Sequence, residues 1–232
     1  TGGFWDTEIG GTMYKAILFD LDGTLTDPKT GITSCVQYAL ADAGIEEPDL
    51  DKLEPFIGPP LTDSFREFYG FDDEQIKRAI DKYHERFDEK GIFENELIEG
   101  IPELLKALKD AGRRVSIASS KPRPLVIRIL EHFEIAQYFD TVVGSEFDGR
   151  FATKEAVVEE ALKQLVPSVY EKEDVAMVGD RKFDIQGARA HGLTGIGVSF
   201  GYAGEHELED AGADYIVDTV EELQRLLLQG SL

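Results

Sequence analysis

The sequence has 232 residues, and its 24 Lys and Arg against 46 Asp and Glu give a formal net charge of −22 at pH 7. Nucleic acids and anionic membranes are bound by clustered cations, so we expect neither as a partner. The charge does not indicate disorder, because 42% of the residues are apolar and 10% are aromatic, enough for a buried core.

The cysteine content and the N-terminal residues indicate the cellular compartment in which we expect the protein. A single cysteine, Cys35, excludes an internal disulfide and a zinc cluster built on cysteines, which fits a reducing cytoplasm. No apolar run reaches the length of a membrane span. Residues 1–12, TGGFWDTEIGGT, lack the basic start and apolar stretch of a signal peptide. We expect them to be an added leader, with Met13 as the natural first residue.

From Lys15 onward, short apolar runs alternate with helical stretches, which is the pattern of a parallel sheet with crossover helices. Runs that are short and continuously apolar predict strands covered on both faces. The expected strands are residues 16–19, 115–118, 141–143, 175–178, 195–198 and 215–217. The expected helices are residues 102–111, 124–132, 154–165, 184–191 and 220–228.

One segment breaks this alternation. Residues 31–97 contain no strand-like run and show only helical periodicity, as in Ile76, Ile80 and Tyr83. The simplest account is a helical insertion directly after the first strand. The predicted fold class is therefore α/β, a doubly wound parallel sheet with an inserted helical domain.

Two aspartates end the first expected strand, in the segment FDLDGTLTD. Alternation along a strand points Asp20 and Asp22 to the same side. Two carboxylates at the tip of a buried strand repel each other unless a cation or a shared proton relieves them. A divalent ion with oxygen ligands is the natural relief, and Mg²⁺ is the usual one where a phosphate is also bound.

A second acidic pair, Asp180 and Asp184, follows the expected strand 175–178 in the segment GDRKFD. Taken alone, Asp180 could equally be a helix cap. Together with the first pair, it places carboxylates at the ends of two strands of one parallel sheet, where open α/β sheets bind ligands.

Further polar residues fall at the same expected edge. Ser119 and Ser120 follow the strand 115–118, and their hydroxyls can donate to phosphoryl oxygens, although serine is common in turns. Lys154 stands at the start of a helix, where the macrodipole disfavours a cation, which suggests a role elsewhere. Residues 111–130 contain no Asp or Glu, so this stretch is locally basic.

Other phosphate chemistries are excluded by inspection. No Gly-Lys pair exists, so there is no P-loop, and Gly195-Ile196-Gly197 lacks the third glycine of a dinucleotide fingerprint. Cys35 has no arginine six positions on, which excludes a cysteine-based phosphatase.

In order along the chain, four motifs resemble those of the haloacid dehalogenase superfamily, closest to its phosphoglycolate phosphatase-like branch. They are the D-x-D-G-T-L segment 20–25, Ser119 with residues 120–122, Lys154, and the G-D-x-x-x-D segment 179–184. The resemblance covers the chain from about Met13 to Leu232. It implies a catalytic core of residues 13–27 and 98–232 and a cap domain of residues 28–97, in which residues 57–61 resemble the cap loop of this branch.

The resemblance also implies a role for each residue. Asp20 is expected to be the nucleophile that forms an aspartyl-phosphate, and Asp22 the general acid and base. Phosphoryl oxygens are expected on Ser119, Ser120 and Lys154. Mg²⁺ is expected on the Asp20 carboxylate, the Asp22 backbone carbonyl and Asp180, with Asp184 bound directly or through water. Arg181, Lys182 and Lys121 could lie near the site or at the surface.

We therefore expect a cytoplasmic, Mg²⁺-dependent phosphatase of small phosphomonoesters such as phosphoglycolate, nucleoside 5′-monophosphates or sugar phosphates. A phosphomutase would use the same residues but return the phosphoryl group to a sugar. A dehalogenase would need neither Asp22 nor the metal set. A receiver-like signalling module would be much shorter and would lack the insertion, and a non-catalytic phosphate-binding scaffold would be expected to have lost Asp20 or Asp22, both of which are present. The sequence marks no interface, so the oligomeric state is open.

Overall fold

Six parallel strands form the centre of the computed structural model, which describes residues 14–165 and 171–230. The expected leader, residues 1–12, lies outside the described residues. The sheet has the order β5-β4-β1-β6-β7-β8, so the chain reverses its direction of winding at β1. In doubly wound sheets ligands bind at such a switch point, outside the carboxyl ends of the strands. The strands are β1 (Ala16–Phe19), β4 (Arg114–Pro122), β5 (Thr141–Ser145), β6 (Val175–Gly179), β7 (Thr194–Val198) and β8 (Tyr215–Val217).

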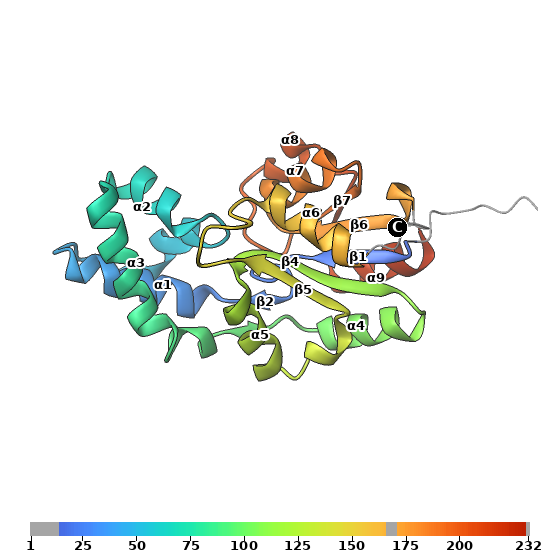
Figure 1. The fold of residues 1–232 in the computed structure, drawn as a ribbon, viewed down its shortest axis with the longest axis horizontal. Helices are drawn as coiled ribbons and strands as arrows, with labels where there is room; N and C mark the ends of the chain where they lie inside the picture. The colour runs from blue at the N-terminus through green and yellow to red at the C-terminus, as the bar shows by residue number, and fades with distance from the viewer. Residues whose placement is uncertain (1–13, 166–170, 231–232) are drawn as a thin grey trace, which may run out of the picture.

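Helices cover both faces of this sheet (Figure 1). One face carries α4 (Ile101–Asp110), α5 (Arg123–His132) and α9 (Val220–Gln229), and the other carries α6 (Lys154–Leu165) and α7 (Lys182–Ala190). Because side chains alternate along a strand, Ile17 and Phe19 of β1 pack in the first layer, whereas Ala16 and Leu18 pack in the second. The predicted α/β class with a doubly wound parallel sheet is confirmed.

All six expected strands and all five expected helices are present, with ends within two residues for every element but β4. That strand continues to Pro122 because it keeps pairing with β5 across an irregularity in register. Ser119 and Ser120 therefore lie within the end of β4 and not in a turn after it. The short helix α8 (Glu207–Ala211), which packs near α7, was not predicted.

The helical insertion lies at one end of the molecule, to the left in Figure 1. It contains the helices α1 (Lys29–Asp42), α2 (Leu61–Tyr69) and α3 (Asp73–Phe87), and the 3₁₀ turns η1 (Leu50–Phe56) and η2 (Gly91–Phe93). Helix α3 starts at a capping box, in which Asp72 and Gln75 each accept a hydrogen bond from the other's backbone N–H.

The two ends of the insertion pair with each other. Strand β2 (Thr26–Asp27) runs antiparallel to β3 (Glu96–Leu97), so the chain leaves and re-enters the core at one place. The expectation that residues 31–97 contain no strand was wrong at this point. A two-residue strand has no periodicity, and its partner lies some seventy positions away in the sequence.

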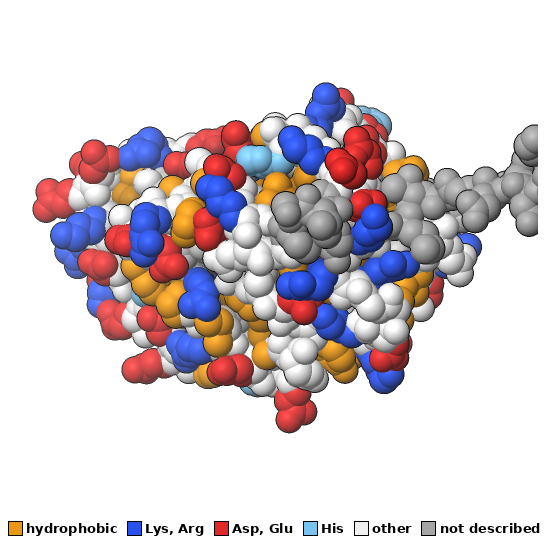
Figure 2. Space-filling model, turned by 45° about the vertical axis from the view of Figure 1, so that its right-hand side comes forward, with side chains coloured by type: hydrophobic (Ala, Val, Ile, Leu, Met, Phe, Trp, Pro, Cys, Tyr) orange, Lys and Arg blue, Asp and Glu red, His pale blue; other side chains and the backbone are white. Residues whose placement is uncertain are grey.

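Acidic and basic side chains are intermingled on the face of the molecule that Figure 2 presents. Exposed ion pairs among the described residues include Lys106 with Asp110 on α4 and Lys163 with Glu159 on α6. Among the described helices, none combines the length and the apolar character needed to cross a membrane.

Candidate active site

Three buried aspartates converge at the carboxyl ends of β1 and β6. Asp20 follows β1, Asp180 follows β6, and Asp184 lies in the first turn of α7. Each offers a carboxylate oxygen, and these oxygens all lie within 4.8 Å of one another. Asp180 and Asp184 are fully buried and Asp20 is 6% exposed. The two sequence motifs, 160 positions apart, thus form one cluster.

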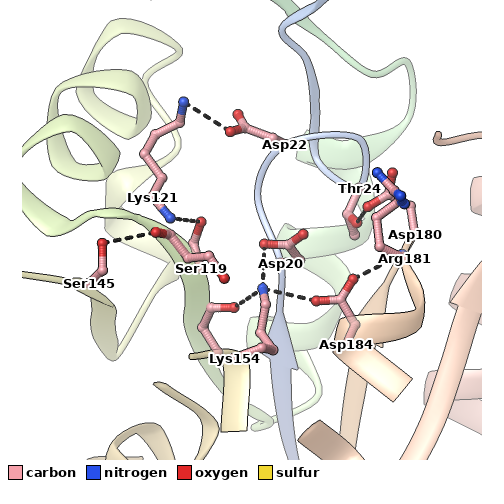
Figure 3. Close-up of polar contacts among 12 residues, drawn as sticks. Asp20, Asp22, Thr24, Ser119, Lys121, Ser145, Lys154, Asp180, Arg181 and Asp184 are labelled. Carbon is pink, nitrogen blue, oxygen red and sulfur yellow. Dashed lines mark hydrogen bonds and ion pairs between the residues drawn. The ribbon is translucent and has the colours of Figure 1, made fainter. Parts of the chain in front are cut away.

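Lys154, at the start of α6, places its ammonium inside this cluster. Its Nζ lies 2.8 Å from Asp20 Oδ1 and 2.9 Å from Asp184 Oδ1, and it donates to the Ala118 carbonyl at 2.9 Å. Figure 3 shows the ammonium between the two carboxylates. The lysine is 8% exposed. Its position explains why a cation stands at a helix N-terminus: the side chain serves the acidic cluster and not its own helix.

Burial and mutual repulsion dominate the electrostatics of the aspartates. Burial, followed by the charges of Asp20 and Asp184, raises the pKa of Asp180 well above its usual range. The pKa of Asp184 is raised to about 6 by burial and by Asp20, against the opposing effect of Lys154. Burial would lower the pKa of Lys154, but the charges of Asp184 and Asp20 more than offset it and raise the pKa above its ordinary value. Three carboxylates face one ammonium, so the cluster favours a further cation.

Glycines make the room that Asp180 occupies. A Cβ on Gly23 would lie 2.1 Å from Asp180 Oδ2, and one on Gly201 would lie 2.3 Å from the Asp180 Cβ. The Tyr202 backbone N–H donates to Asp180 Oδ2 at 2.8 Å, and the Thr24 hydroxyl donates to Oδ1 at 3.4 Å. The loop after Asp22 and the loop after β7 therefore hold this carboxylate in place.

Gly23→Ala tests whether this packing matters. If the acidic cluster holds a divalent cation, we expect this variant to bind it about tenfold or more weakly, because the added methyl group would displace Asp180. The matched control is Gly44→Ala, since Gly44 has a similar φ of +79° against +82° at Gly23 but nothing within 4 Å of the added Cβ. Both variants carry the strain of a left-handed alanine, about 1 kcal/mol. Isothermal titration with Mg²⁺ is the measurement, and equal affinities in the two variants would contradict the packing role.

The donor set fits Mg²⁺. Asp20, Asp180 and Asp184 supply hard oxygen ligands, and the negative charge that one ammonium leaves on three buried carboxylates would be balanced by a divalent cation. Gly179 contributes to the fit, because a Cβ there would lie 2.1 Å from the Asp184 Cγ. Asp22 was expected to bind the same ion through its backbone carbonyl and not through its side chain. Its carboxylate points away from the acidic cluster, toward Lys121.

Asp22 turns its side chain toward Lys121. Lys121 Nζ lies 2.9 Å from Asp22 Oδ2, and both side chains are nearly buried. Asp22 Oδ1 is buried and has no hydrogen-bond partner among the described residues. Burial raises the pKa of Asp22, although the ammonium of Lys121 opposes this shift. Asp22 is therefore a carboxyl group with an oxygen directed at no protein partner, separate from the acidic cluster (Figure 3).

The serines at the end of β4 adjoin both groups. The Lys121 backbone N–H donates to Ser119 Oγ at 3.2 Å, and the Ser145 hydroxyl donates to the Ser120 carbonyl at 2.8 Å. A small cavity is lined by Asp20, Asp22, Ser119, Ser120, Lys154 and Asp184, among others. The structure thus brings every sequence-predicted residue except Asp180 to the wall of one cavity, and Asp180 stands directly behind it in the acidic cluster.

Arg181 connects this site to the helical insertion. Its guanidinium donates to the Ile57 carbonyl at 2.6 Å and to Glu207 Oε1 at 2.8 Å. Glu207 also accepts from the Lys182 backbone N–H. The side chain packs closely on Gly58, where a Cβ would meet Arg181 Nη1 at 3.0 Å. The loop of residues 57–61 is therefore attached to the core next to Asp180.

Comparison with known proteins identifies the family. The model of the haloacid dehalogenase-like hydrolases matches residues 17–198. The chain belongs to this family. The predicted membership and the prediction of an enzyme are thereby confirmed.

Relatives of this hydrolase extend over most of its length. A protein named 5′-nucleotidase from Pseudomonas aeruginosa is 46% identical over 196 residues, which are 84% of this chain and 87% of that protein. Tyrosine-protein kinase PtkA of Mycobacterium tuberculosis is 37% identical over 220 residues, 94% of this chain and 74% of that one. A crystal structure described as a predicted phosphatase from Clostridium acetobutylicum has a TM-score of 0.88 and 46% identity, covering 94% of this chain and 99% of that chain.

Three cations near the hydrolase's site were left undecided by the sequence. Lys121 and Arg181 are partly buried, with Lys121 paired with Asp22 and Arg181 hydrogen-bonded to the Ile57 carbonyl, whereas Lys182 is exposed. The acid-free stretch 111–130 was a signal for Lys121, and adjacency to Asp180 was one for Arg181. The hydrogen bond from the Tyr202 backbone N–H to Asp180 could not be predicted from the sequence, because a backbone N–H is present in any residue other than proline.

Proposed function

We propose that this hydrolase is a Mg²⁺-dependent phosphatase that cleaves small phosphomonoesters through an aspartyl-phosphate on Asp20. The observation that carries the proposal is the position of Lys154, whose ammonium contacts both Asp20 and Asp184 at the wall of a cavity that Asp22 also lines. A nucleophile, an acid and a charge-neutralising group around one cavity are what phosphoryl transfer requires.

In the first half-reaction, a carboxylate oxygen of Asp20 attacks phosphorus and forms the acyl-phosphate bond. The bond from phosphorus to the ester oxygen breaks, and Asp22 gives its proton to that departing alkoxide. The contact from Lys154 supports the role of Asp20 as nucleophile, because its hydrogen bond to Asp20 Oδ1 holds that carboxylate at the wall of the cavity. The raised pKa of Asp22 favours the protonated acid that this step needs.

In the second half-reaction, Asp22 accepts a proton from a water molecule as the water's oxygen attacks phosphorus. The acyl-phosphate bond breaks, which returns the Asp20 carboxylate and releases inorganic phosphate. Ser119, Ser120 and Lys154 line the cavity where the transferring oxygens would sit, and their donors would bind them. Asp20, Asp180 and Asp184 would hold Mg²⁺, which when bound neutralises charge between the carboxylates and the phosphoryl group.

The helical insertion, residues 28–97, would work as a cap that closes over the core residues 13–27 and 98–232 and excludes water. The Arg181 bond to the Ile57 carbonyl supports this, because it fastens the cap loop beside the site.

Arg181→Met should lower kcat/KM by about 10- to 100-fold, since it removes charged hydrogen bonds to Ile57 and Glu207 while keeping the length of the side chain. Arg189→Met is the control, because Arg189 lies near the end of α7, the helix that Arg181 caps, and among the described residues its guanidinium donates to carbonyls at the end of α8 at 3.4 and 3.5 Å. Steady-state kinetics of both variants is the measurement. Equal kcat/KM values in the two variants would remove Arg181 from the account.

Candidate substrates are phosphoglycolate, nucleoside 5′-monophosphates and sugar phosphates. Relatives named 5′-nucleotidase and phosphoglycolate phosphatase support the first two classes. The proposed setting is the cytoplasm, which the free, buried Cys35 suits.

Phosphate release from a broad panel of phosphomonoesters tests the proposal. Purified protein with Mg²⁺ should release inorganic phosphate from at least one class, and a chelator should abolish the release. If no monoester yields phosphate with Mg²⁺ present, the phosphatase proposal fails. Transfer of the phosphoryl group to a second sugar hydroxyl, without net release, would favour a phosphomutase.

A further inference from the structure

A second, larger cavity adjoins the phosphate site, between the helical insertion and the core. It has a volume of about 230 Å³. Asp22, Gly58, Ser120 and Lys121 line both cavities. The proposed acid, Asp22, therefore stands at the boundary between them. A monoester with its phosphoryl group beside Asp20 would extend its alcohol past Asp22 into the larger cavity.

Aromatic and aliphatic side chains make most of the wall of this larger cavity. Tyr83 and Phe87 of α3 stack on each other, with ring centroids 5.2 Å apart and planes 18° apart. The Phe87 ring centroid lies 4.6 Å from Lys121 Nζ, the atom that pairs with Asp22. The aromatic part of the cavity wall therefore begins next to the Lys121–Asp22 pair. At the outer end, the imidazole of His84 meets the exposed ring of Phe147 from the loop after β5.

Positive charge is scarce in the same wall. Among the described side chains that line it, Lys121 is the one lysine or arginine, and its ammonium is already in contact with the Asp22 carboxyl group and the Phe87 ring. The imidazole of His84 lies 3.3 Å from the Asp88 carboxylate. A second anionic group on the substrate would lose its hydration in this cavity and would have to compete with Asp22 for that one ammonium.

We infer that the larger cavity selects monoesters whose alcohol is uncharged and carries an aromatic or similar planar ring, and that it disfavours alcohols with a carboxylate. This inference rests on the proposed phosphatase function and narrows its substrate class. It separates nucleoside and aryl monoesters from phosphoglycolate. The apolar wall supplies the attraction, and the scarcity of cations in it supplies the rejection.

Binding of stable phosphonates tests the selection without turnover. Calorimetry on the wild-type protein with Mg²⁺ compares methylphosphonate, benzylphosphonate and 3-phosphonopropionate, which mimics phosphoglycolate. Benzylphosphonate should bind about tenfold more tightly than methylphosphonate, whereas 3-phosphonopropionate should bind no more tightly than methylphosphonate. Tighter binding of 3-phosphonopropionate than of benzylphosphonate, or no binding of any of the three, overturns the inference.

A charge placed in the wall tests the reason for rejection. Ile80 is half-buried at the edge of this cavity on α3, so a long side chain there can reach inward without disrupting the core. Ile80→Lys should tighten binding of 3-phosphonopropionate by about tenfold relative to methylphosphonate. Ile80→Met, which is unbranched but uncharged, should leave that ratio unchanged. A ratio that stays the same in the lysine variant contradicts the inference.

Hydrolysis assays run in parallel separate the two ideas. Release of phosphate from phenyl phosphate or a nucleoside 5′-monophosphate, with little from phosphoglycolate, supports both the phosphatase proposal and the selectivity of the cavity. Whichever of the first two esters is hydrolysed faster shows which kind of ring the cavity prefers. Fastest release from phosphoglycolate overturns the inference but keeps the phosphatase. Selective binding of benzylphosphonate with no hydrolysis of any ester keeps the ring selectivity and overturns the phosphatase.

Discussion

Asp20→Asn is expected to lower phosphate release by about 10⁴-fold or more, because the amide cannot form the acyl-phosphate bond. The substitution keeps the size of the side chain, and Lys154 retains its contacts with Asp184 and the Ala118 carbonyl. It also removes one of three mutually repelling carboxylates. The free energy of unfolding without Mg²⁺ should therefore stay equal or rise, so the lost activity would not reflect misfolding. Kinetics and urea denaturation of the same preparation measure both.

A second Asp-Leu-Asp tripeptide provides the control for Asp20→Asn. Asp49, Leu50 and Asp51 repeat the local sequence, but Asp51 is exposed and pairs with Lys29 at the surface of the insertion. Asp51→Asn should leave kcat/KM within about twofold of wild type, since exposed ion pairs contribute little. Full turnover in Asp20→Asn would remove Asp20 from the role of nucleophile, whatever the control does.

Lys154→Met is expected to have the largest effect on stability. It removes the only ammonium that contacts Asp20 and Asp184 among the described residues and leaves the three buried carboxylates of the cluster without that cation. Breaking a buried ion pair on one side costs about 3–5 kcal/mol, so the free energy of unfolding without Mg²⁺ should fall by that amount. Activity with saturating Mg²⁺ should fall by about 10²- to 10³-fold, because the transferring phosphoryl oxygens lose a charged donor.

Lys163→Met is the matched control on the same helix. Lys163 pairs with Glu159 on the exposed side of α6, and its side chain is 63% exposed. Its substitution should change neither activity nor stability measurably. If Lys154→Met unfolded at the same urea concentration as Lys163→Met, the buried ammonium would not be balancing the acidic cluster.

The sheet and the acidic cluster could be predicted from the sequence because their signals are local. Residues 16–19 and 175–178 are short apolar runs that are each followed within two residues by an aspartate, and parallel strands bring such ends together. The starts of the last three predicted helices fell close to the observed ones for the same reason, because each begins just after polar or acidic residues.

What the sequence could not give depends on contacts between distant residues. Arg181 reaches Ile57 across 124 positions, and β3 pairs with β2 through two backbone positions each. Lys121 lies in the acid-free stretch 111–130, but this local signal is shared with exposed cations such as Arg123, and only the packing against Phe87 and Asp22 places Lys121 in the site. The length of β4 likewise follows from its partner β5 and not from its own residues, which include two serines and a proline at its end.

The most direct test of the proposed chemistry is to trap the acyl-phosphate. Protein that is turning over a phosphomonoester with Mg²⁺ is quenched in acid and reduced with borohydride, which converts an aspartyl-phosphate into homoserine, and its peptides are sequenced by mass spectrometry. Homoserine at position 20, absent without substrate and absent in Asp20→Asn, is the expected result. Active turnover with homoserine at another aspartate, or at none, would contradict an aspartyl-phosphate on Asp20.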